Sequence, residues 1–138
     1  MITAVDTNVL LDVLTADREH GDASRTALSQ AHADGALVIC EVVYAELAAA
    51  FASQPDSLEP FLADAALRLV RTPEPALADA GAMWRAYRDR GGRRTRVLAD
   101  FLVAAHADAV ADRLLSRDRG FPTLAPPSLE ILDPHTLG

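Results

Sequence analysis

The sequence predicts an α/β protein built on a mostly parallel sheet with helices on both faces. Two observations lead to this fold class. Short, continuous apolar runs alternate along the chain with longer segments whose apolar residues recur at helical spacing, as in doubly covered parallel sheets. The chain also has 138 residues, half of them hydrophobic, which is enough for one domain with a real core. We therefore expect a single domain over residues 1–138.

The first expected strand covers residues 2–5, and a helix follows over residues 9–14. Asp6, Thr7 and Asn8 lie between them and supply the polar side chains that begin a helix. Asp6 is thereby placed at the carboxyl end of a strand. In open α/β sheets this edge binds ligands, because the loops diverge there and helix amino termini point into the crevice.

The rest of the chain continues the alternation. We expect helices over residues 20–33 and 41–51, from near Pro60, from Pro75 to about residue 89, and over residues 97–107. We expect the further strands over residues 37–40, 67–71, 114–115 and 129–132, with a turn over residues 116–120 and an irregular loop around Pro122, Pro126 and Pro127.

Charge is unevenly distributed along the chain. The net charge of -7 argues against a general nucleic-acid binder, because neutralisation of phosphates dominates that kind of affinity. All thirteen basic residues are Arg, however, and one short window holds six of them: Arg85, Arg88, Arg90, Arg93, Arg94 and Arg96. An acidic protein thus carries one concentrated basic patch.

Two classes of protein are disfavoured by simple counts. Cys40 is the one cysteine, which excludes an internal disulfide framework and a cysteine metal cluster. No apolar run approaches the roughly 20 residues needed to cross a bilayer, and no basic region precedes the apolar start of the chain. We therefore expect a soluble, cytoplasmic protein that does not engage a membrane.

Four acidic residues stand where an apolar residue would be expected. Asp6 follows a buried strand, and Glu46 falls within the apolar arc of the 41–51 helix. Asp100 is the only charge between residues 97 and 105, and Asp118 comes soon after the strand at residues 114–115. Taken singly, each has an ordinary structural interpretation. Asp6 and Asp100 could cap helices, Glu46 could pair with a buried Arg, and Asp118 could be a turn residue.

Taken together, the four carboxylates need a common counter-charge, because an unpaired carboxylate is costly in an apolar interior. Hard divalent cations prefer oxygen ligands, and two such ions roughly 4 Å apart can activate water and stabilise a leaving oxygen. The residues alone therefore indicate a metal-dependent phosphodiesterase. Phosphatases and response-regulator receivers that begin with a similar Asp usually need a Lys, and this chain has none.

Four stretches, in this order, carry a family resemblance: Val5-Asp6-Thr7-Asn8-Val9-Leu10-Leu11-Asp12, Tyr44-Ala45-Glu46-Leu47, Ala99-Asp100-Phe101-Leu102-Val103-Ala104-Ala105-His106-Ala107 and Leu114-Leu115-Ser116-Arg117-Asp118-Arg119-Gly120-Phe121. They resemble the four motifs of PIN-domain ribonucleases, and most of all those of the VapC toxins of bacterial toxin-antitoxin pairs. The resemblance implies a three-layer α/β/α sandwich with a five-stranded, mostly parallel sheet, a homodimer, an antitoxin partner, and cleavage of RNA with Mg²⁺ or Mn²⁺.

By motif position, the resemblance implies that Asp6, Glu46, Asp100 and Asp118 are the catalytic, metal-binding tetrad. Thr7 and Asn8 match its polar pair, and Ser116 stands where the fourth motif has Thr or Ser. For Asp12, which also matches the first motif, we expect a structural hydrogen-bonding role. A rival interpretation keeps the PIN fold but not turnover, as an RNA- or protein-binding module.

The expected reaction is in-line hydrolysis that leaves 5′-phosphate and 3′-hydroxyl ends. It requires no histidine, and His106 lies about 240° around the helix from Asp100. For contact with the RNA backbone we expect Arg93, Arg94 and Arg96, which lie on the connection leading to Asp100. The alternative for this patch is a solvated helix face paired with neighbouring acids.

Overall fold

A computed structural model describes residues 1–93 and 96–136 of the chain. Five strands form one sheet, in the order β3-β2-β1-β4-β5, and every neighbouring pair is parallel. The strands are β1 (Ile2–Val5), β2 (Ala36–Ile39), β3 (Leu67–Leu69), β4 (Arg113–Leu115) and β5 (Glu130–Leu132). The helices are α1 (Thr7–Leu14), α2 (Gly21–Asp34), α3 (Glu41–Ala50), α4 (Leu58–Asp64) after a 3₁₀ turn (Pro55–Ser57), α5 (Glu74–Asp89), α6 (Leu98–Val110) and α7 (Phe121–Leu124).

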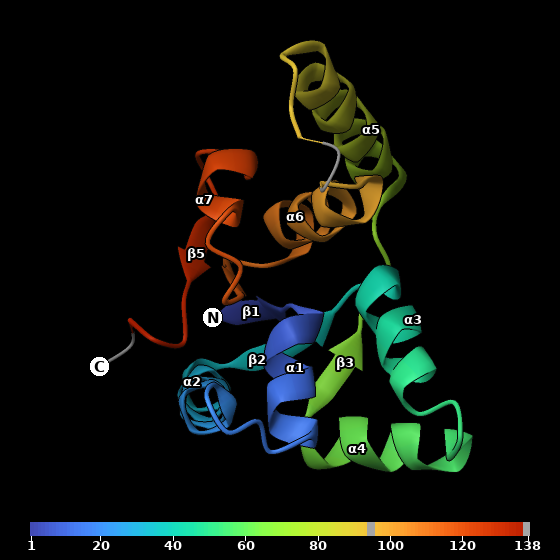
Figure 1. Cartoon of the computed structure of the whole chain (residues 1–138), viewed down its shortest axis with the longest axis vertical. Helices are drawn as coiled ribbons and strands as arrows, with labels where there is room; N and C mark the ends of the chain where they lie inside the picture. Colours follow the sequence, from blue (N-terminus) through green and yellow to red (C-terminus); the bar gives the residue numbers. More distant parts are fainter. Residues whose placement is uncertain (94–95, 137–138) are drawn as a thin grey trace.

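The helices form a layer on each side of this sheet. Helices α1, α2 and α4 lie on one side, and α5, α6 and α7 lie on the other (Figure 1). Helix α3 contacts both α1 and α6, so it spans the two layers at one end of the sheet. The strand order places β1 between β2 and β4, which is the position where the direction of the chain across the sheet reverses. The predicted α/β/α sandwich is confirmed, and Asp6 follows the strand at the reversal.

The core is packed around the central strands. Each central strand has a fully buried residue: Val5 on β1, Ile39 on β2 and Leu115 on β4. Helix α1 adds Val9 and Leu10. A second, smaller cluster joins α5 to α6 through Ala76, Ala80, Phe101 and Ala105. The two long helices of that layer therefore pack as a pair, and the start of α6 is held beside the sheet.

Most element boundaries agree with the sequence, and the differences have local causes. Helix α1 begins at Thr7 rather than at residue 9, because Asp6 itself occupies the capping position. The region expected to be an irregular loop contains the short helix α7, whose first turn accommodates Pro122. Within residues 1–93 and 96–136, no helix is long and apolar enough to cross a membrane.

Candidate metal and RNA site

The register of β1 and β4 brings the first and fourth motifs together. Val5 pairs with Leu115, and the Asp6 backbone N–H donates to the Leu115 carbonyl at 2.9 Å. Asp6 and Ser116 consequently leave the sheet side by side, although 110 positions separate them in the chain. The parallel pairing of two adjacent strands is thus what assembles the centre of the candidate site.

Asp6 is almost fully buried, with 9% of its surface exposed. One carboxylate oxygen accepts from the Thr7 N–H at 2.8 Å, and the other accepts from the Ser116 hydroxyl at 2.7 Å and the Asn8 amide at 3.3 Å. Burial raises the pKa of Asp6 to about 6, against the hydrogen bonds of Ser116 and Thr7 and with help from the nearby charges of Glu46 and Asp118. The pocket around Asp6 therefore favours a positive counter-charge.

Ser116 is the centre of the hydrogen-bond network. It is fully buried, donates to Asp6, and accepts from the Asp118 N–H at 3.1 Å and from the Asn8 amide at 3.4 Å. The Asn8 carbonyl in turn accepts from the Arg117 N–H at 3.3 Å. Ser116 and Asn8 thereby fix the orientation of Asp6 and the position of Asp118.

Glu46 reaches the same place from α3, but it is not buried as the sequence predicted. Its side chain is exposed, and Val43 and Leu47 are the residues of α3 that enter the core. The prediction was wrong because only part of the apolar arc of α3 is covered, and Glu46 lies toward the uncovered edge. Its carboxylate accepts from the Thr7 hydroxyl at 2.9 Å, which ties it to the start of α1.

Asp100 is the third residue of α6, and Val97 rather than Asp100 occupies the capping position that was considered for Asp100. Its carboxylate accepts from the Val97 N–H at 3.2 Å, as a residue in the first helical turn commonly does, and it also faces the site. Asp118 accepts from the Gly120 N–H at 2.9 Å and is held by both terminal nitrogens of Arg96. The hydrogen bond from Arg96, against the effect of burial, keeps the pKa of Asp118 below its usual value.

All four predicted carboxylates line one open cleft of about 290 Å³. Thr7 and Asn8 line it as well, together with Leu11, Val97 and Val103. Among the residues that the structure describes, no three carboxylate, His or Cys side chains stand close enough to hold an ion in this arrangement. The donor set nevertheless fits a hard divalent cation, because it consists of carboxylate oxygens around an Asp whose pKa is raised by burial and, to a smaller extent, by the charges of Glu46 and Asp118.

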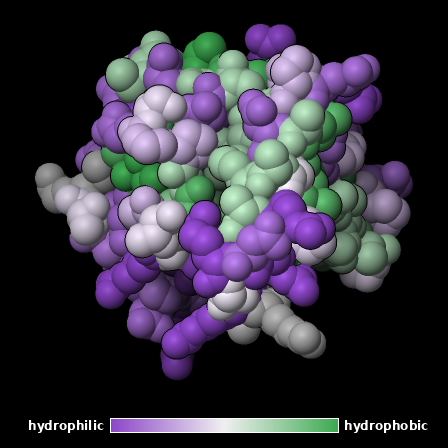
Figure 2. Space-filling model, turned by 90° about the horizontal axis from the view of Figure 1, so that it is seen from above, coloured by the Kyte–Doolittle hydropathy of each residue, from purple (hydrophilic) through white to green (hydrophobic). Residues whose placement is uncertain are grey.

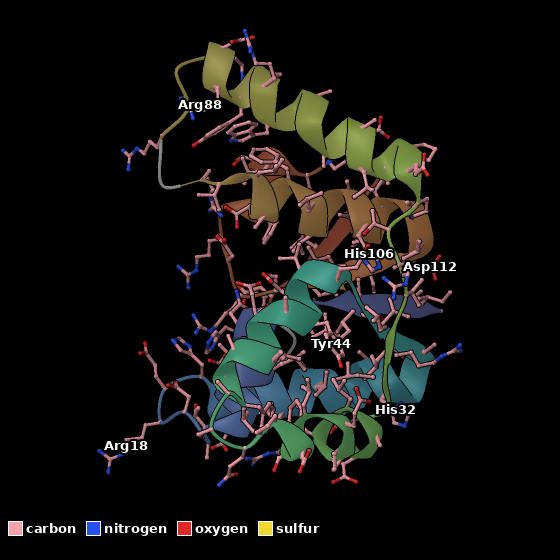
Figure 3. The ribbon with its side chains drawn as sticks, turned by 90° about the vertical axis from the view of Figure 1, so that its right-hand side faces the viewer. Arg18, His32, Tyr44, Arg88, His106 and Asp112 are labelled. Atoms are coloured by element: carbon pink, nitrogen blue, oxygen red, sulfur yellow. The ribbon has the colours of Figure 1, made fainter. Side chains whose placement is uncertain are left out.

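The predicted RNA-contact residues occupy different environments. Arg93 is exposed, Arg94 lies outside the described residues, and Arg96 pairs with Asp118 at the edge of the cleft. The rest of the basic patch is partly engaged on α5 itself, since Arg85 pairs with Asp89 at 3.1 Å and Arg88 stacks over Trp84. Arg88 projects from the last turn of α5 (Figure 3).

His106 is placed away from the carboxylates. It is fully buried on α6, and its Nε2 lies 2.7 Å from the Val70 carbonyl just after β3 (Figure 3). This position agrees with the structural role that its angle from Asp100 predicted.

Sequence reasoning missed two ion pairs beside the site. Arg117 donates two hydrogen bonds to the buried Asp12, at 2.7 and 3.0 Å, and Ser24 donates a third at 2.8 Å. Arg96 holds Asp118. Arg117 adjoins Asp118 in the sequence and Arg96 precedes Asp100 by four positions, but each pairs most closely with another carboxylate, so the sequence held no direct signal of these pairs. The Arg117–Asp12 pair fastens the loop after β4 to α1 and so supports Ser116.

Comparisons with known proteins agree with this architecture. The PIN domain family model matches residues 3–125. VapBC2 from Rickettsia felis, bound to a DNA fragment from its promoter, has a TM-score of 0.75 at 19% identity, with 96% of this chain and 98% of that chain covered. VapBC-1 from nontypeable Haemophilus influenzae has a TM-score of 0.76 at 20% identity, with 99% and 100% covered.

A third structure, VapBC-5 from Mycobacterium tuberculosis, is described as a member of the VapBC family of toxin-antitoxin systems. It has a TM-score of 0.62 at 18% identity, with 96% and 98% of the two chains covered. A search of the curated proteins found no match. Likeness at these identities shows the fold, whereas the family model covers most of the chain; the protein belongs to the PIN domain family.

Proposed function

We propose that this PIN-domain protein is a VapC-type toxin, an endoribonuclease that hydrolyses RNA phosphodiester bonds with Mg²⁺ or Mn²⁺. The observation that carries the proposal is the convergence of Asp6, Glu46, Asp100 and Asp118 on one cleft. The raised pKa of Asp6 adds to it, because a carboxylate that is poorly neutralised by the protein is suited to bind a cation.

The four carboxylates would hold the cation, which supplies charge neutralisation at the scissile phosphate and activation of a water molecule. Ser116 and Asn8 orient Asp6, and Thr7 orients Glu46. The Asp118 backbone N–H donates to the Ser116 hydroxyl, and the Gly120 N–H donates to the Asp118 carboxylate, which together hold Asp118 in place. We expect 5′-phosphate and 3′-hydroxyl products.

We propose that Arg93, Arg94 and Arg96 contact the phosphates of the RNA backbone. Arg93 is exposed near the start of the connection to α6, where a phosphate can approach from solvent. Arg96 contacts Asp118, one of the carboxylates that line the cleft. Electrostatic attraction by these residues is independent of base sequence and would be weakened by salt.

We further propose a homodimer and an antitoxin partner for a single PIN domain spanning residues 1–138, acting on cytoplasmic RNA. The structural neighbours named above come from toxin-antitoxin complexes, which supports a protein partner. Leu77, Val97 and Leu98 are exposed on α5 and around the start of α6. The face seen in Figure 2 carries hydrophobic patches among hydrophilic ones, as protein-binding surfaces often do.

Two observations favour a second candidate, a binding module of the PIN fold without turnover. Arg96 already neutralises Asp118, and no three ligands are gathered among the described residues. Incubation of the purified protein with single-stranded RNA and either Mg²⁺ or Mn²⁺ separates the two functions. Cleavage that produces 5′-phosphate ends and is lost in Asp6→Asn supports the ribonuclease, whereas RNA binding without cleavage in both proteins supports the module.

A further inference from the structure

Arg96 does not lie on the surface with the rest of the basic patch. Its two terminal nitrogens both donate to Asp118, one to each carboxylate oxygen. The nearer nitrogen also lies 3.9 Å from the carboxylate of Asp100. One guanidinium thus faces two of the four carboxylates of the cleft, and only 22% of the Arg96 side chain is exposed. Paired, fork-shaped hydrogen bonding of this kind is the strongest arrangement that Arg makes with a carboxylate.

The loop after β4 is shaped around this guanidinium. A Cβ atom on Gly120 would overlap a terminal nitrogen of Arg96, so a side chain at residue 120 would force this guanidinium to shift. The Phe121 ring lies on another side, with its centroid 6.0 Å from the guanidinium carbon. Asp118, Gly120 and Phe121 together form a fitted site for one positive group.

The carboxylates of the cleft differ in their positively charged partners. Asp118 has a full counter-charge in Arg96, and Asp100 has a distant one. Among residues 1–93 and 96–136, Asp6 has no such partner, since its contacts there are the neutral donors Thr7, Asn8 and Ser116. A divalent cation that recruits Asp118 must therefore compete with Arg96, whereas one that binds at Asp6 does not.

We propose that Arg96 is an internal counter-ion of the PIN site, which occupies Asp118 in the cation-free protein and must leave it before Asp118 can bind a divalent metal ion. This role of a positioning residue rests on the proposed function for the existence of the metal site. It predicts that the protein's own arginine weakens metal binding. Arg96 released from Asp118 would then be available to a phosphate group.

Two variants test the competition by different means. Arg96→Gln removes the charge, and Gly120→Ala keeps the charge but places a methyl group where the Arg96 guanidinium lies. Each has a matched control: Arg90→Gln removes an exposed charge from the same connection, and Gly81→Ala adds a Cβ that meets nothing within 4 Å. The measurement is the affinity for Mn²⁺ by titration calorimetry in the absence of RNA, with the secondary structure of each variant checked by circular dichroism.

We expect Arg96→Gln to bind Mn²⁺ at least roughly tenfold more tightly than the wild type, which corresponds to about 1.4 kcal/mol. Gly120→Ala should tighten binding in the same direction, and both controls should stay within about twofold of the wild type, because a distant exposed charge is screened. Arg96→Lys, which keeps the charge without the fork-shaped pairing, should fall between the wild type and Arg96→Gln.

Several results would overturn the proposal. If Arg96→Gln and Gly120→Ala bound Mn²⁺ as tightly as the wild type or more weakly, Arg96 would only fix the conformation of Asp118. An equal gain in Arg90→Gln would reduce the effect to net charge. Absence of Mn²⁺ binding in every variant would remove both this proposal and the metal site of the proposed function. Tighter binding without any cleavage of RNA would instead leave the counter-ion role standing and refute the ribonuclease alone.

Discussion

The Ser116 hydroxyl donates a 2.7 Å hydrogen bond to the Asp6 carboxylate, across the junction of β1 and β4. The same hydroxyl accepts from the Asp118 N–H, so one buried oxygen links the Asp6 carboxylate to the backbone of Asp118. The candidate site is therefore as rigid as the parallel pairing beneath it. Groups that orient metal-binding carboxylates commonly influence affinity nearly as much as the ligands themselves.

Ser116→Ala should weaken Mn²⁺ binding and RNA cleavage by about 10- to 100-fold, because Asp6 loses its shortest side-chain hydrogen bond. Ser116→Thr keeps the hydroxyl and should retain most of both properties. Calorimetry and a cleavage assay on the two variants make the comparison. Equal behaviour of Ser116→Ala and the wild type would show that Asp6 needs no such orientation.

Asp6→Asn should make the cation-free protein more stable at pH 7.5, by about 3 kcal/mol, because the pKa of Asp6 is raised by roughly two units on folding and one pKa unit is worth about 1.4 kcal/mol. The pKa of Asp6 is raised from 3.8 to about 6, so the folded state binds this proton more tightly than the unfolded state. Wild-type stability should thus rise as the pH falls from above 6 toward 4, and the advantage of Asp6→Asn should shrink. Urea unfolding in EDTA across that pH range measures the free energy of unfolding of both proteins. An Asp6→Asn variant less stable than the wild type at pH 7.5 would refute the claim that the buried Asp6 carboxylate destabilises the fold.

Asp12 has the opposite dependence on pH. Burial alone would raise its pKa, but hydrogen bonds from Arg117 and Ser24 hold it below 3.8. The unfolded chain therefore takes up this proton first, and the stability that Asp12 contributes is complete above about pH 4 and is lost as the pH falls further.

Arg117→Met should cost roughly 1–2 kcal/mol at pH 7, because it leaves a buried carboxylate with one side-chain donor while part of Arg117 faces solvent. The cost should decline below pH 4, where Asp12 becomes protonated in the variant. Arg119→Met, which changes an exposed neighbour, is the control. A constant difference across the pH range would contradict the ion-pair account.

The combined variant Arg93→Gln, Arg94→Gln and Arg96→Gln should weaken binding to unrelated RNAs by similar factors and flatten the dependence of affinity on salt. Filter binding at several salt concentrations, in the absence of divalent cations, provides the slopes. A variant whose affinity and slope equal those of the wild type would eliminate this patch as the RNA contact.

The sequence predicted the sheet and the chemistry of the site better than it predicted burial. Continuous apolar runs identified β1, β2 and β4, because a strand covered on both faces leaves little room for polar residues. The edge strands β3 and β5 each contain a charged residue, and β3 was expected from its alternation. Asp6 and Asp118 were placed at strand ends by the same runs. Glu46 was misjudged, since helical periodicity gives the direction of a side chain but not how far the neighbouring layer extends over it.

The contacts of Arg96 and Arg117 were beyond sequence reasoning for a different reason. Each pairs with a carboxylate from another element, Asp118 in the first case and Asp12 in the second. Such pairs depend on the path of a loop and on a missing Cβ at Gly120, neither of which has a periodic signal. The basic window appeared to be one patch, and the fold divides it among α5, the surface and the cleft.

The most direct measurement is to express the wild type and Asp6→Asn in bacterial cells and sequence the 5′ ends of total RNA, with and without the product of a neighbouring gene. Asp22→Asn, which changes an exposed carboxylate on α2, is the matched control. The account predicts growth arrest and discrete new 5′-phosphate ends with the wild type and Asp22→Asn, and neither with Asp6→Asn. Intact RNA and normal growth with a folded, metal-binding wild type would contradict it and favour the binding module.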